Sequence, residues 1–230
     1  MILIQETQLV VNVLDSKCSE QVKFDVFRRV NTGGIPLNAQ EIRNIMAVNS
    51  VRSLLRDMSR SSEFIKATRG RVNDIRMDAQ ELCLRFIAFY ARYDNVDHKL
   101  NELKSLVQML DFMILFLNRQ DEGQLGALLD VFKESMEKCY ALLGEEAFSK
   151  ETSRFIINKP LFISWSVVMA GLPKGVEELR KKQDEAVRLK HKYYESGKYF
   201  NAITSSTTTR KNIELQFEAV EAILEELFDD

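Results

Sequence analysis

The stretch that decides the fold is LKSLVQMLDFMILFLN, residues 103–118, where apolar side chains return every three or four positions. This spacing places them on one side of an α-helix. Residues 125–143 repeat the pattern, and we expect the two segments to form an antiparallel pair of helices. The apolar positions of the first segment are Leu103, Leu106, Val107, Leu110, Met113, Ile114 and Leu117.

Helical patterns cover most of the remaining chain, and only TQLVVNVL, residues 7–14, has the β-branched composition of a buried strand. We predict a mainly α fold, a helical bundle with a short N-terminal α/β remnant. The domain boundary is expected near Leu37, with an α/β segment over 1–37 and a helical domain over 38–230. The other predicted helices cover 19–30, 51–71 with a Ser-rich break at 59–62, 160–170, 176–194 and 212–228, and two more begin at Asn38 and Asp78.

The composition is that of a globular protein, with 45% hydrophobic and 29% charged residues among 230. The net charge is -2, so the overall charge does not indicate nucleic acid as a partner. The charge is unevenly distributed, because residues 28–76 hold ten Arg or Lys against four acids. The sequence therefore predicts a basic region within an acidic protein.

The cysteines and the apolar segments indicate where the chain resides. Cys18, Cys83 and Cys139 form no CxxC pair, so the sequence indicates neither a disulfide framework nor a zinc ribbon. The longest apolar run, residues 112–117, is too short to span a bilayer, and the first residues lack the pattern of a signal peptide. We expect a cytoplasmic protein with reduced thiols and no membrane contact.

The motifs of common enzymes are missing from the sequence. His98 and His191 are isolated, and no HExxH, GxxxxGK[ST], GxGxxG or GxSxG occurs. Paired carboxylates such as Glu145 and Glu146 lie at helix starts, where they complement the helix dipole. We therefore predict no metal site and nominate no catalytic residue.

One motif does point to a ligand: FDVFRRVNTGGIPLNAQEIRN, residues 24–44. Two arginines end a helix, a turn follows at Asn31–Gly34, and a capped helix begins at Asn38. The turn can simply satisfy backbone geometry at a helix-turn-helix corner. Alternatively, the guanidinium groups and the open N–H groups of the glycine turn can bind phosphate.

This motif resembles the second signature of the GmrSD-type, DUF 262 proteins, which has the form FxRxNxGGxxLxxQExRN. Two weaker similarities lie in residues 76–86, which resemble the "R…ELxLRFxA" helix of the family, and residues 199–203, which resemble its closing segment. The family fold resembles ParB and sulfiredoxin. Its members bind and hydrolyse nucleotides and serve modification-dependent restriction systems in anti-phage defence, often with an HNH-type nuclease.

The resemblance implies a phosphate or nucleotide site and a nucleoside triphosphate as the candidate cofactor. The first signature of the family, DGQQR, is absent from these 230 residues, and so is an HNH centre. We therefore expect a C-terminal helical portion that is not active as an enzyme alone. The residues assigned to the phosphate site are Phe27, Arg28, Asn31, Gly33, Gly34 and Arg43.

The basic region gives a second hypothesis, a non-catalytic interaction or oligomerisation module. Its arginines would meet DNA or an acidic protein partner, and the helical bundle would bind a nuclease domain, another protein or a second copy. Phosphate contacts of this kind make binding depend steeply on salt. The residues assigned to nucleic-acid binding are Arg52, Arg56, Arg60, Arg69 and Arg71.

Overall fold

The computed structural model describes residues 11, 13, 17–19, 22, 23, 25, 26, 29, 36–72, 74–93, 105–151 and 156–228. These residues fold almost entirely as α-helices, as predicted. The helices are α2 (Ala39–Met46), α3 (Asn49–Arg60), α4 (Ser62–Ala67), α5 (Asp78–Tyr93), α7 (Leu106–Leu117), α8 (Glu122–Leu143), α9 (Lys159–Gly171), α10 (Val176–Lys181), α11 (Gln183–Glu195), α12 (Lys198–Thr204) and α13 (Arg210–Phe228), with a 3-10 turn at Gly144–Glu146.

The α/β remnant predicted for residues 1–37 finds no support in the described residues, which contain no strand. Of the predicted strand over 7–14, only Val11 and Val13 are described, and both lie outside any strand. The predicted helix over 19–30 is described in part, and Val22, Lys23 and Arg29 have helical backbone there. The β-branched composition of residues 7–14 thus predicts a strand that Val11 and Val13 do not form.

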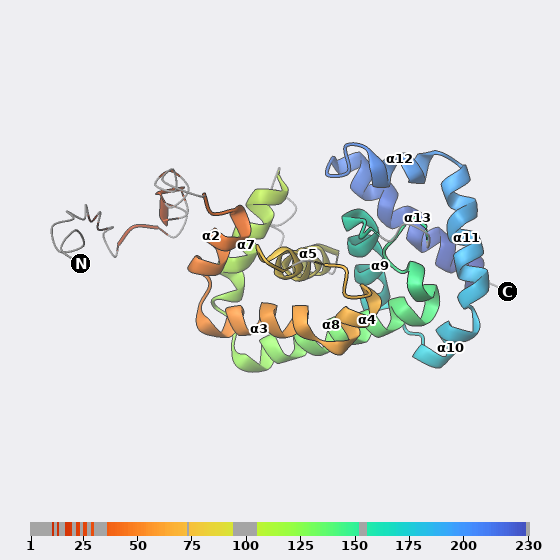
Figure 1. Ribbon diagram of the computed structural model, residues 1–230, viewed down its shortest axis with the longest axis horizontal. Helices are drawn as coiled ribbons and strands as arrows, with labels where there is room; N and C mark the ends of the chain where they lie inside the picture. The colour runs from red at the N-terminus through yellow and green to blue at the C-terminus, as the bar shows by residue number, and fades with distance from the viewer. Residues whose placement is uncertain are drawn as a thin grey trace, which may run out of the picture.

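Helices α7 and α8 begin and end close to the predicted positions, but they do not form an antiparallel pair. Helix α7 packs on α5 and α2, whereas α8 packs on α3, α4, α9, α10 and α11. Figure 1 shows α8 running along the base of the molecule and α7 rising at one end of it. Apolar spacing defines the face that a helix buries, but it does not define the helix that covers this face.

A cluster of aromatic rings joins the central helices α4, α5, α8 and α9. The ring centroids of Phe86 and Phe132 lie 5.0 Å apart, and those of Phe148 and Phe162 lie 4.8 Å apart. Phe64 contacts both Phe132 and Phe162, which connects the two pairs. Edge-to-face contacts of this kind add to the stability given by burial alone. Among the helices of the described residues, none combines the length and apolar character that a membrane span requires.

The start of α2 is fixed by the predicted capping box. Asn38 Oδ1 accepts a hydrogen bond from Glu41 N at 2.8 Å, and Glu41 Oε2 accepts one from Asn38 N at 2.6 Å. Asn38 Nδ2 also donates to Arg76 O, and the Arg76 guanidinium pairs with Glu41. This hydrogen bond to Glu41 and the charge of Glu41 raise the pKa of Arg76. The cap therefore also holds the loop before α5 against α2.

We expect the substitution Asn38→Ala to lower the free energy of unfolding by about 1 kcal/mol, because it removes a side-chain cap. Asn38→Asp keeps the acceptor for Glu41 N but loses the donor to Arg76 O, so its effect should be smaller. Urea unfolding followed by circular dichroism measures both variants. Equal losses in the two variants would mean that the link to Arg76, and not the cap, supplies the stability.

Candidate functional site

Most of the predicted phosphate site lies outside the described residues, namely Phe27, Arg28, Asn31, Gly33 and Gly34. Arg43 is described, and it lies in the core between α2 and α7 with 1% of its surface exposed. Its Nε donates a hydrogen bond to Asp111 Oδ1 at 2.8 Å. The structure therefore places Arg43 as a buried contact between two helices and away from the surface.

The arginines assigned to nucleic-acid binding are separated into two places. Arg52, Arg56 and Arg60 are four residues apart, so they follow one side of α3. Arg52 donates to Asn49 Oδ1 and Arg56 donates to Ser53 Oγ, both on the same helix. Arg69 and Arg71 follow α4, and Arg69 Nη1 lies 3.6 Å from Glu145 Oε2.

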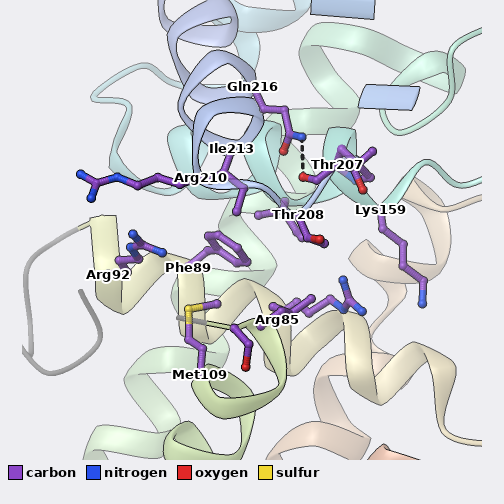
Figure 2. Close-up of a pocket in the computed structure, with 14 residues that line it drawn as sticks. Arg85, Phe89, Arg92, Met109, Lys159, Thr207, Thr208, Arg210, Ile213 and Gln216 are labelled. Carbon is purple, nitrogen blue, oxygen red and sulfur yellow. Dashed lines mark hydrogen bonds between the residues drawn. The ribbon is translucent and has the colours of Figure 1, made fainter. Parts of the chain in front are cut away.

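A different set of cations lines a cavity of about 600 Å³. The cavity is bounded by one face of α5, by the first turns of α7, α9 and α13, and by the loop before α13 (Figure 2). Phe89 and Met109 line it, together with the hydroxyl-bearing residues Ser105, Thr207 and Thr208. Its cationic side chains are Arg85, Arg92, Lys159 and Arg210.

The first residues of three helices line this cavity. Ser105 caps α7 by accepting a hydrogen bond from Gln108 N, Asn158 caps α9 by accepting one from Leu161 N, and Thr209 Oγ1 accepts one from Asn212 N at the start of α13. A helix N-terminus carries roughly half a positive charge. The three helix ends therefore add to the field of the cationic side chains and favour an anion.

One carboxylate holds the two cations at the α9 side of the cavity. Glu81 Oε1 accepts hydrogen bonds from Arg85 Nη2 at 2.7 Å and from Lys159 Nζ at 3.3 Å. Partial burial raises the pKa of Glu81, but attraction by Arg85 and Lys159 outweighs burial, so the pKa lies below its usual value. Glu81 thus stays ionised and positions both cations, while the pair keeps an excess of positive charge.

The loop before α13 is held by amide side chains. Gln216 Nε2 donates to Ala202 O at 2.8 Å and to Thr207 O at 2.9 Å, the latter drawn in Figure 2. Asn212 Nδ2 donates to Ser205 O and Ser206 O. Because Gln216 is buried, Thr207 and Thr208 have a fixed position at the cavity before any ligand arrives.

None of the four cations of this cavity is among the site residues predicted from the sequence. Arg85, Phe89 and Arg92 do share a face of α5, since they are four and three residues apart. That spacing was the one signal available from the sequence. The other two cations, Lys159 and Arg210, lie 67 and 118 residues after Arg92, and only the tertiary fold brings them to α5.

The described residues hold no group of three or more His, Cys, Asp or Glu side chains arranged to bind a metal ion. The arrangement at the cavity is instead suited to binding an anion through charge-assisted hydrogen bonds. Scans of the chain against protein-family models, curated proteins and solved structures each return no match.

Proposed function

We propose that the chain is the helical part of a GmrSD-type, nucleotide-dependent restriction protein of the cytoplasm, and that its cavity binds phosphate groups of a nucleotide or nucleic acid. The observation that carries the proposal is that four cations, Arg85, Arg92, Lys159 and Arg210, and the first residues of three helices line one cavity. The motif at residues 24–44 supports the family part of the proposal.

The chemistry of the cavity is binding and orientation. Guanidinium groups donate paired hydrogen bonds to phosphate oxygens, and the hydroxyls of Thr207 and Thr208 can donate further ones. No residue is assigned a part in bond cleavage. We propose that hydrolysis in such a system depends on a nucleotide-binding half and a nuclease partner.

We expect Arg85→Met to weaken the binding of a phosphate ligand about tenfold, because it removes one charge-assisted contact. Isothermal titration calorimetry of the full chain with ATP and with a dT8 oligonucleotide measures this. The affinity of both ligands should also fall between 50 and 200 mM salt. Arg56→Met on α3 is the matched control and should leave binding within twofold of wild type.

The second candidate function is an interaction module that uses the arginine row of α3. The observation that favours it is the spacing of Arg52, Arg56 and Arg60 along one side of this helix, which suits an acidic protein partner or a DNA backbone. If this function is correct, the calorimetry should give the opposite result: Arg56→Met weakens ligand binding and Arg85→Met leaves it unchanged. Loss in neither variant would reject both functions.

A further inference from the structure

A second, smaller cavity of about 190 Å³ adjoins the first. Phe89, Arg92, Arg210 and Ile213 line both cavities, so the two form one groove between α5 and the start of α13. A groove formed by two adjoining cavities can hold a ligand that has more than one anionic group.

Cations and apolar groups alternate along the groove. Arg85 and Arg92 are seven residues apart on α5, about 10 Å along the helix axis. In Figure 2, Arg85 and Lys159 lie on one side of Phe89, and Arg92 and Arg210 lie on the other. Because Phe89 lies between the two pairs, the groove offers a separate anion position at each pair.

The smaller cavity adds an aromatic surface beyond the second cation pair. The ring of Tyr93 stacks on Phe217 with centroids 5.6 Å apart, and Tyr93 is 45% exposed. The Tyr93 hydroxyl donates to Glu221 Oε1 at 2.6 Å, which fixes the ring at the end of α5. An exposed, fixed ring of this kind can stack with an unpaired base.

Two acidic side chains contact cations of the groove. Glu81 contacts Arg85 and Lys159, and Glu214 accepts a hydrogen bond from Arg210 Nε at 2.8 Å. Glu214 orients Arg210 along the groove, and it opposes a polyanion by like-charge repulsion.

Together these features distinguish the possible ligands. A mononucleotide would use one cation pair and leave the other without an anion. Duplex DNA has its bases stacked within the helix and offers none to Tyr93. A single strand offers phosphates and open bases in alternation, which matches the order of groups in the groove.

We infer that the groove binds a segment of single-stranded nucleic acid, with one phosphate at Arg85 and Lys159, another at Arg92 and Arg210, and a base stacked on Tyr93. This inference rests on the proposed function, since it uses the same cavity, and it names the class of ligand. The salt dependence of binding should then reflect several phosphates.

The test compares dT4, thymidine 5′-monophosphate and a blunt 12-base-pair duplex on the full chain by calorimetry at low salt. We expect dT4 to bind roughly 30-fold more tightly than the monophosphate, because its second phosphate contact is intramolecular. Tyr93→Leu should weaken dT4 about tenfold through lost stacking and leave the monophosphate within twofold. Tyr93→Phe keeps the ring and should bind dT4 as wild type does.

Three results would overturn the inference, and they separate it from the proposed function. Equal affinity for dT4 and the monophosphate would leave a single phosphate position, so the proposed function would stand without a strand. If the duplex binds more tightly than dT4, the cations of the groove contact the backbone of double-stranded DNA, and the inference of a single strand is wrong. Absence of binding to folded protein, checked by circular dichroism, would reject the proposed function as well. Glu214→Gln serves as an independent check and should strengthen dT4 binding.

Discussion

Replacing Asp111 by Ala is expected to lower the free energy of unfolding by about 3–5 kcal/mol. Asp111 is 2% exposed and its Oδ1 accepts the hydrogen bond from Arg43 Nε, so its removal leaves a buried guanidinium without this carboxylate. A buried charge that loses its counterion is among the most costly changes in a protein core. Urea unfolding monitored by circular dichroism measures the loss.

Two comparisons show whether the pair is the cause. Asp57→Ala removes an exposed carboxylate on α3 and should change stability by less than about 0.5 kcal/mol. The double substitution Arg43→Met with Asp111→Leu removes both charges, and we expect it to recover most of the stability lost in Asp111→Ala. If the double variant is as unstable as the single one, packing rather than charge explains the loss.

Lys190 should make stability depend on pH in the alkaline range. Its ammonium is buried, and it donates to Glu146 O at 2.7 Å and to Ser149 O at 3.0 Å. Burial lowers the pKa of Lys190 to about 8, although the charge of Glu146 partly opposes this shift. In the unfolded chain the lysine keeps its proton up to a pKa of about 10.4.

The direction of the change in the free energy of unfolding with pH follows from the number of protons that each state binds. Between pH 8 and 10.5 the unfolded state holds more protons than the folded state, so the free energy of unfolding rises with pH. The rise due to Lys190 is about 3 kcal/mol over this interval. Below pH 8 the contribution is lost, because both states then carry the charge and the folded state holds it buried.

Lys190→Met isolates this effect from other groups. Burial raises the pKa of the Cys83 and Cys139 thiols, and these groups lower stability as pH rises in wild type and variant alike. The difference in urea stability between the two proteins should therefore change by about 3 kcal/mol from pH 8 to 10.5. Lys192→Met, at an exposed position, should show no such change. A flat difference for Lys190→Met would contradict a lowered pKa.

Local signals in the sequence gave reliable predictions. The cap at Asn38 depends on residues three positions apart, and the break between α3 and α4 coincides with Ser61, whose side chain caps α4 by accepting a hydrogen bond from Phe64 N. Helix starts of this kind are determined by hydrogen bonds within one turn. They can be found without knowledge of the tertiary fold.

Other features needed the tertiary fold. The predicted helix over 176–194 is two helices, α10 and α11, which divide at Lys182 with neither Gly nor Pro there. The sequence predicts Arg43 as a phosphate ligand, whereas in the structure Arg43 is buried and pairs with Asp111. A sequence shows which residues are charged. It does not show that Arg43 is buried or that its partner is Asp111, because the two residues are 68 positions apart.

The candidate site shows the same limit more strongly. The motif at residues 24–44 predicts a phosphate site in the N-terminal part of the chain. Five of its six predicted phosphate ligands lie outside the described residues. The cavity instead takes its cations from α5, α9 and α13. No short window of sequence contains them together, so no motif search could find this site.

The dispersed origin of the cavity walls also has a thermodynamic consequence. Because α5, α7, α9 and α13 all contribute, the cavity exists only in the folded chain, and a ligand that binds there draws the folding equilibrium toward the native state by mass action. At 100 times its dissociation constant such a ligand adds about 2.7 kcal/mol to the free energy of unfolding. The melting temperature of this protein thus becomes a label-free readout with which a library of anions can be ranked.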